Sequence, residues 1–378
     1  MDRVITVVDI LISSFIVTPL LICFWWGTWS FQIYSNAFPI LWSLYISTGL
    51  VFVFTLLREP LYEKRMPGVV GLLIARIYIY AFALCCITQF YAAFTILDRL
   101  MDVRMTIISV VIGVFLMSYL RSLGTLLGPP YFLFLDHKRK TVFIYPTMFQ
   151  KGSTGNFWFY LLDCVFSVCI IGMLVVFVWR GCWTLLDIFL CPDNMVLSTW
   201  MSLGIGYTIV GITFALQPPM KYLANELSGI SRMLIVDTYL LFSFCGTVNV
   251  WRGVWKFQDI YFFPENPALS YALSHFVPFL LLVLINSSNS ILVRGVYIDG
   301  EEAGAQCVDF PCYYLRLIFQ SKRKEKIIRE AEKMKGAEKV EQRLSEGEVL
   351  IQVGVNPNEP SWKNKSINNF CSPEVNQH

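Results

Sequence analysis

The sequence predicts an all-α polytopic membrane protein with eight transmembrane helices. Of its 378 residues, 56% are hydrophobic, and the mean hydropathy is +0.56, which is more apolar than a typical soluble domain. The hydrophobic residues gather into runs of about 20 or more, the length that crosses the hydrocarbon core as a helix. Lys and Arg are concentrated in alternate connections between these runs, as loops on the cytoplasmic side require.

Eight apolar runs follow one another along the chain. The expected spans are residues 5–29, 37–57, 69–97, 105–128, 157–186, 196–216, 232–256 and 267–293. Several are longer than the minimum, so we expect tilted helices. The first run begins almost at Met1 and has the length of a span, which favours a retained helix over a cleaved signal peptide.

The positive charges predict the orientation. If the N-terminus is cytoplasmic, the inward segments hold twelve Lys and Arg and the outward segments hold five. Both termini are therefore expected in the cytoplasm.

A nine-residue element recurs at the outer ends of the odd-numbered spans, and we call it the aromatic motif. Its two clearest copies are "WRGCWTLLD" (Trp179–Asp187) and "WRGVWKFQD" (Trp251–Asp259), and its weaker copies are "FYAAFTILD" (Phe90–Asp98) and "WWGTWSFQI" (Trp25–Ile33). Self-similarity at a regular spacing indicates repeated structural units. The repeat predicts four helical hairpins arranged as two parallel four-helix halves, residues 1–130 and 157–295.

Two further segments complete the expected organisation. Residues 131–156 form a connecting insert that is rich in β-formers around a polar centre, which predicts a short cytoplasmic β-hairpin. Residues 296–378 form a polar cytoplasmic tail. We expect a basic amphipathic helix over about 313–343 and disorder after it.

The two clearest motif copies suggest an outer-face site. In a helix, the arginine and the aspartate of one copy lie on one stripe, so we expect Arg180 beside Asp187 and Arg252 beside Asp259. Such stripes can bind an anionic ligand or an outside partner. The alternative is an interfacial anchor, because Trp gathers at the membrane surface and Arg reaches to headgroups. The candidate residues are Trp179, Arg180, Asp187, Trp251, Arg252 and Asp259. The two N-terminal copies carry Trp26 and Tyr91 in place of the arginines, so this site belongs to the second half.

Four ionisable residues lie inside the odd-numbered spans at matching depths. Asp9 and Asp163 stand 16 residues before the first aromatic of their motif copy, and Arg76 and Asp237 stand 14 before theirs. An ionisable side chain within a span is a functional hypothesis by default, here a shared network that relays a cation or a proton. The structural alternative pairs Arg76 with Asp237 or Asp163, while Asp9 reaches the interface.

Polar groups at the end of the last span and in the tail have open roles. Residues 286–290 can join helices by hydrogen bonds or line a wet cavity. The basic tail residues can bind anionic lipid, at about 1 kcal/mol per charge, or a cytoplasmic partner, or can simply be solvated. These residues are Arg316, Lys322, Arg323, Lys324, Lys326 and Arg329. Cys307 and Cys312 are candidate palmitoylation sites.

The sequence offers no catalytic, cofactor or metal site. None of its three histidines has the spacing of a metal ligand set, and no GxSxG, P-loop or dinucleotide pattern occurs. We expect a protein that is not an enzyme and has no nucleic-acid partner.

"VWRGCW" (Val178–Trp183) and "VWRGVW" (Val250–Trp255), with the eight spans around them, resemble the fuseless family of eight-pass animal membrane proteins. The resemblance covers residues 1–300 and not the tail. It implies a neuronal protein of the presynaptic membrane, required for synaptic transmission and for placing voltage-gated calcium channels at active zones. It implies a calcium channel or an active-zone scaffold as partner. It carries over no functional residues.

Two classes of function follow. In the first, the protein is a non-enzymatic membrane organiser that offers lateral surfaces to a channel or scaffold and holds lipid or partners with its basic tail. In the second, it is a transporter or channel whose pathway is lined by Arg180, Arg252 and the buried aspartates. A continuous polar cavity that reaches the midplane would favour the second class, and a dry bundle would favour the first.

Overall fold

The computed structural model describes residues 2–64, 66, 68–149, 157–299, 305–310, 312, 314, 315 and 330. The chain divides into two compact units, residues 1–315 and 316–378, and the apolar helices that the described residues form lie in the first. No strand occurs among the described residues.

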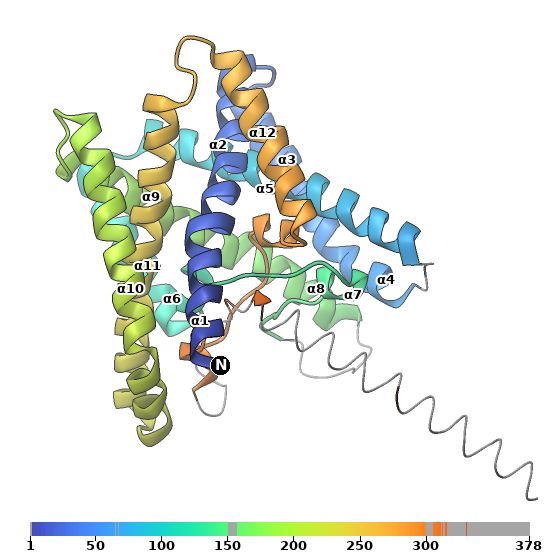
Figure 1. The fold of residues 1–378 in the computed structure, drawn as a ribbon, viewed down its shortest axis with the longest axis vertical. Coiled ribbons are helices and arrows are strands. Elements are labelled where there is room, and N and C mark those ends of the chain that lie inside the picture. The colour runs from blue at the N-terminus through green and yellow to red at the C-terminus, as the bar shows by residue number, and fades with distance from the viewer. Residues whose placement is uncertain are drawn as a thin grey trace, which may run out of the picture. The chain divides into compact units, whose positions relative to one another are not determined.

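Among the described residues, seven helices are long and apolar enough to cross a membrane, and Figure 1 shows how they are arranged. They are α1 (Asp2–Ile12) continued by the π-helical turn η1 (Ser13–Val17) and α2 (Thr18–Ser35); α3 (Ile40–Leu56) followed by α4 (Arg58–Glu63); α5 (Gly68–Leu100); α8 (Phe157–Val165) continued by the π-helical turn η3 (Phe166–Ile171) and α9 (Gly172–Phe189); α10 (Met195–Glu226); α11 (Gly229–Tyr261); and α12 (Pro267–Leu284). An eighth apolar helix, α6 (Val103–Tyr119), has 17 residues. The short elements are α7 (Arg139–Val142) and the 3-10 turns η2 (Leu123–Leu126), η4 (Ser288–Ile291) and η5 (Gln306–Val308).

Helices α6 and α12 end earlier than their apolar runs do. The expected spans reach residues 128 and 293, whereas the helices stop at Tyr119 and Leu284. Each is followed by a residue with φ of 56°, Arg121 or Asn286. The next N–H then donates to a carbonyl five residues back, from Ser122 to Met117 (2.9 Å) and from Ser287 to Leu282 (2.8 Å). This is the left-handed stop typical of helix C-termini.

The even-numbered spans pack outside the odd-numbered ones. Helix α3 packs on α5, α6 on α9, and α10 on α11, while α12 returns to pack on α2 (Figure 1). The expected hairpins of the first and second spans, the third and fourth, and so on are therefore wrong as packing units. Each even span packs instead on the odd span that follows it, and the last span packs on the first. The division into two parallel four-helix halves stays a prediction.

Glycine permits close approach in two of these pairs, α12–α2 and α10–α11. A β-carbon on Gly27 of α2 would lie 2.8 Å from the backbone N of His275 in α12, and one on Gly206 of α10 would lie 2.6 Å from the N of Val250 in α11. A β-carbon on Gly253 of α11 would lie 2.7 Å from the side chain of Leu203 in α10 and 2.9 Å from its backbone N. Small residues allow helices to approach closely where the membrane supplies no hydrophobic driving force between them.

Two π-helical turns account for an irregularity in the repeat. Turns η1 and η3 lie in the first and fifth spans, between the buried aspartate and the aromatic motif. The third and seventh spans, α5 and α11, are continuous α-helices over the same interval. A π-helical turn accommodates extra residues per turn. The spacing of 16 residues in two spans and 14 in the other two therefore brings equivalent groups to similar depth.

The described part of the connecting insert, residues 131–149, contains the short helix α7 and no strand, so the expected β-hairpin is wrong there. We call residues 120–136 arm 1 and residues 285–299 arm 2, and the two arms bond each other reciprocally. From arm 1, Phe134 N donates to Ser290 Oγ (2.9 Å) and Asp136 N to Asn286 O (3.0 Å); from arm 2, Tyr297 N donates to Thr125 Oγ1 (3.0 Å) and Asp299 N to Arg121 O (2.9 Å). Because Ser290 and Asn286 of arm 2 accept hydrogen bonds from the N–H groups of Phe134 and Asp136, these two groups need no partner strand within the insert.

Candidate functional site

The charged positions of the aromatic motif join neighbouring helices. Arg180 Nε lies 2.8 Å from Asp98 Oδ1, and Arg252 Nε lies 2.9 Å from Asp187 Oδ1. The expected pairs Arg180–Asp187 and Arg252–Asp259 are wrong, because seven residues of helix separate their backbones by about 10 Å along the axis. In each actual pair, the second position of one copy meets the ninth position of the copy before it.

A third link of the same kind involves a tryptophan. The Trp26 indole donates to Asp259 Oδ1 at 2.7 Å, again from a second position to a ninth position. The fourth link does not form, because the corresponding residues are Tyr91 and Ile33. There the Tyr91 ring packs edge-on against Trp29, with centroids 5.4 Å apart.

Both motif arginines are buried inside the bundle. Arg180 is 2% exposed and Arg252 is 3% exposed. Arg252 donates to Ser202 Oγ (2.6 Å) and Ser198 Oγ (2.8 Å) on α10, and Arg180 donates to Thr106 Oγ1 (2.7 Å) on α6. Side chains held in this way neither reach lipid headgroups nor remain open to an anionic ligand. The arginines therefore join each inner helix to its outer partner.

The aromatic positions of the motif form two layers of rings, which we call the aromatic tiers. One tier consists of the first position of each copy, Phe90, Trp25, Trp251 and Trp179, and the other of the fifth position, Phe94, Trp29, Trp255 and Trp183. Within each tier, successive rings meet edge to face with centroids 5.4–5.6 Å apart. Such pairs contribute about 0.5–1.5 kcal/mol each beyond their buried area.

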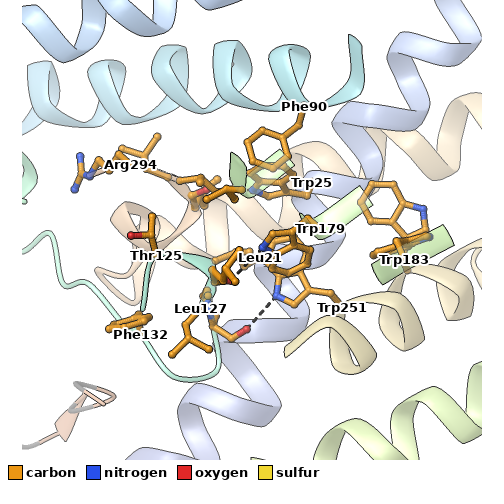
Figure 2. A pocket seen from close by; sticks show the side chains of 18 of the residues that line it. Leu21, Trp25, Phe90, Thr125, Leu127, Phe132, Trp179, Trp183, Trp251 and Arg294 are labelled. Carbon is orange, nitrogen blue, oxygen red and sulfur yellow. Dashed lines mark hydrogen bonds between the residues drawn. The ribbon is translucent and has the colours of Figure 1, made fainter. Parts of the chain in front are cut away.

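The tiers surround a cavity of about 370 Å³ (Figure 2). The arms line its other end, and three indole N–H groups tie the tiers to them. Trp25 donates to Ile291 O (3.1 Å), Trp179 to Leu126 O (3.1 Å) and Trp251 to Pro129 O (3.0 Å). Asp98 and Asp187 line the cavity at the motif end, and Arg294 lines it at the arm end. Most of the remaining lining residues are aromatic or aliphatic.

The four intramembrane ionisable residues form no shared network. Each is held by its own segment: Asp9 Oδ1 accepts the N–H of Leu315 (2.5 Å), and Asp163 Oδ1 accepts the N–H of Phe149 (3.0 Å). Asp9 is fully buried within the protein. Asp9 in the first span thus anchors the segment that follows arm 2, and Asp163 in the fifth span anchors the segment that follows arm 1.

The other two residues hold the turns after α12 and α6. Arg76 pairs with Asp136 of arm 1 (3.1 Å), which corrects the expected pairing with Asp163 or Asp237. It also donates to Asn286 Oδ1 (3.0 Å) and Ser288 Oγ (3.1 Å), so these polar residues do join helices. Asp237 accepts the hydroxyl of Ser118 at the end of α6.

Asp299 of arm 2 lies close to Asp237 and is only 3% exposed. Its Oδ2 accepts the N–H of Gly124 at 3.4 Å. Burial and then the charge of Asp237 raise the pKa of Asp299 to about 7, although backbone hydrogen bonds and Arg121 oppose the shift. The arm thus holds a carboxyl group that keeps its proton to near-neutral pH.

This raised pKa predicts that acidity stabilises the fold. An unfolded aspartate loses its proton near pH 3.8, whereas the folded one keeps it to about 7, so this contribution to the free energy of unfolding falls as pH rises through that window and is level above it. We expect the melting temperature in detergent to fall between pH 5 and pH 7.5, and Asp299→Asn to remove part of that fall. Asp193→Asn, at an exposed position, should leave the profile unchanged. Identical profiles for wild type and Asp299→Asn would contradict the prediction.

The predicted tail sites fall largely outside the described residues. Arg316, Lys322, Arg323, Lys324, Lys326, Arg329 and nearly all of the helix expected over 313–343 lie there. Cys312 is buried at 2% exposure, so it is not accessible to an acyl transferase in this conformation. Cys307 is half-buried, its sulfur accepts from Arg232 (3.9 Å), and burial raises its pKa. Palmitoylation of Cys307 stays a prediction.

Sequence reasoning missed the partners of the site more often than its arginines. Asp98 is the ninth residue of the motif copy Phe90–Asp98, and this repeat position could have identified it as an acidic partner of a motif arginine. Ser198, Ser202 and Thr106 lie on even-numbered helices and carry no motif of their own. Asp136 lies in the insert, where its neighbours Lys138, Arg139 and Lys140 suggest a solvated turn. No feature of the sequence near Asp136 indicates that its partner is Arg76.

Over the described residues, an all-helical bundle of long apolar helices joined by ion pairs such as Arg180–Asp98 and Arg252–Asp187 defines an integral multi-pass membrane protein. The family model described as Fuseless matches residues 4–292, and the chain belongs to the Fuseless family. That match indicates no enzyme family. No curated protein and no solved structure matches the chain.

Proposed function

We propose that this protein is a non-enzymatic organiser of the presynaptic plasma membrane, which supports synaptic transmission by localising voltage-gated calcium channels at active zones. Both termini lie in the cytoplasm in this proposal. Membership of the Fuseless family supports it, as does the resemblance carried by the two WRGxW copies. The structural support is the state of the charged residues in the spans.

Each charge considered for a pathway is engaged within the fold. Arg180 and Arg252 are paired with carboxylates and bonded to hydroxyls, and Arg76 is paired with Asp136. The three intramembrane aspartates accept bonds from a backbone N–H or a serine. A transport pathway needs polar groups along a continuous route. Charges committed to helix joining favour a scaffold, and the transporter alternative has only the aromatic cavity in its favour.

The proposed partners meet the protein at two kinds of surface. The outer helices α3, α6, α10 and α12 expose large apolar side chains to the membrane, where a channel or another scaffold can pack. On the cytoplasmic side, the basic tail residues attract the anionic lipid of the inner leaflet or bind an acidic partner segment. In this proposal, localisation requires both the apolar surface and the basic tail, because packing between helices does not by itself select one region of the membrane.

Neutralising the basic tail is expected to abolish clustering at active zones. In the full-length protein, Lys322, Arg323, Lys324, Lys326 and Arg329 are replaced by glutamine. Each near-surface charge contributes about 1 kcal/mol to the attraction by anionic lipid, so losing five weakens it by orders of magnitude. The measurement is the overlap of the tagged protein with calcium channels in neurons, together with its amount in the membrane fraction.

The matched control changes Lys322, Lys324 and Lys326 to arginine, which keeps every charge. This variant should cluster like wild type. Normal clustering of the neutralised variant, at a normal amount in the membrane, would count against the tail as the localising element.

A further inference from the structure

The cavity between the aromatic tiers has unused carboxylate oxygens at its motif end. Asp98 and Asp187 both line it, and their side chains are 56% and 38% exposed. Each uses Oδ1 for its arginine. Within the described part of the chain, the second oxygen of each carboxylate accepts no hydrogen bond. Two acceptors therefore remain open to a donor that enters the cavity.

The positive partners of these carboxylates are not among the residues that line the cavity. The Nη atoms of Arg180 and Arg252 are held by hydroxyls on α6 and α10, toward the outer helices. Lys256 lies 3.8 Å from Asp187 and is likewise outside the lining. At the arm end, the Arg294 guanidinium points away from the tiers (Figure 2), donates to Asn289 and stacks over Tyr145. The charge presented to the cavity near the tiers is therefore negative.

The walls suit a cation. Trp gives the strongest cation–π attraction of any side chain, worth about 0.5–2 kcal/mol per contact depending on desolvation. Six of the eight rings in the tiers are tryptophans. A volume of about 370 Å³ falls within the range of small-molecule sites.

We propose that this cavity binds a small organic cation, a protonated or quaternary amine with an apolar body. The ammonium lies at the motif end beside Asp98 and Asp187, and the apolar body lies between the aromatic tiers. Asp98 lies on α5 and Asp187 on α9, which are adjacent inner helices. The tier rings of these two helices do not pair with each other, and the ligand joins the two helices at this gap. Such a ligand would tighten the bundle, whether or not the protein organises channels.

The test uses the full-length protein purified in detergent and benzyltrimethylammonium as the probe, with binding followed by calorimetry. Two molecules of similar size serve as comparisons, the neutral 2-phenyl-2-propanol and the anionic phenylmethanesulfonate. We expect saturable binding of the cation, at least tenfold tighter than of either comparison molecule. No saturable binding of the cation, or equal binding of the neutral molecule, overturns the proposal.

Variants then locate the site. Trp183→Leu should weaken cation binding about tenfold. It breaks no ion pair, and within the described residues the Trp183 indole makes a ring contact with Trp255 but no hydrogen bond. If Trp183→Leu does not fold, Trp183→Phe gives the same comparison with a weaker ring face. Asp193→Asn, at an exposed carboxylate outside the cavity, should bind like wild type. Unchanged affinity in the folded Trp183 variant would overturn the placement between the tiers.

Discussion

Replacing Arg252 by methionine is expected to destabilise the fold by about 1–3 kcal/mol, the cost of leaving buried hydrogen-bonding groups without their partner. The change leaves Asp187 without its closest cation and leaves the Ser198 and Ser202 hydroxyls without their shared donor. The free energy of unfolding in mixed micelles measures this loss directly. A lower yield of the variant in the membrane fraction should accompany it.

The matched control is Lys256→Met, one turn further along the same helix. Lys256 lies 3.8 Å from the same carboxylate but is 20% exposed, and partly exposed pairs of this kind contribute about 0–1 kcal/mol. Its replacement should barely move the free energy of unfolding. Equal effects of the two substitutions would show that Arg252 does not hold α11 to α9 and α10.

Gly206→Ala is expected to destabilise the α10–α11 pair by about 1–3 kcal/mol, the range for overpacking a close contact. The new β-carbon would lie 2.6 Å from Val250 N and 3.0 Å from Asn249 C, and these backbone atoms cannot turn aside as a side chain can. Thermal unfolding in detergent and the distance between the two helices, measured between attached spin labels, would both report the change.

Gly204→Ala provides the comparison two residues away. Nothing lies within 4 Å of a β-carbon at Gly204, and alanine is the better helix former by about 1 kcal/mol. This variant should therefore be neutral or slightly stabilising. A loss of stability as large as that of Gly206→Ala would mean that helix–helix approach is not what Gly206 provides.

The fold class follows from the sequence because hydrophobic length is a property of single segments. The ends of α6 and α12 do not follow, since short polar stretches such as Arg121–Ser122 and residues 286–290 do not by themselves exclude a span that continues past them. Their backbone turns at Arg121 and Asn286 to exchange hydrogen bonds between the arms. The β-hairpin fails for the same reason, because a local pattern cannot show that arm 2 supplies the partner.

The candidate site could likewise be predicted only in part: the sequence identified its arginines but not their partners. The repeat located Arg180 and Arg252, and it marked the ninth position as their acid partner. Helical spacing within one copy then assigned the wrong aspartate, since the neighbouring copy supplies it. Pairing between helices depends on which helices are adjacent, and the sequence alone suggested the wrong neighbours. The intramembrane charges were correctly singled out, but their partners lie in segments with no membrane signal, such as Asp136 in the insert.

The packing of α12 on α2 bears on how the protein assembles during synthesis. A chain emerges from the ribosome in order, so α3 and α5, α6 and α9, and α10 and α11 can each pair once both members have been made. On its glycine face the first span has no such early partner, because Gly27 packs against His275 in α12, the last of the apolar helices that the structure describes. The first span can pack on α5 through the aromatic tiers as soon as α5 has been made, but its contact with α12 can form only after α12 has been synthesised.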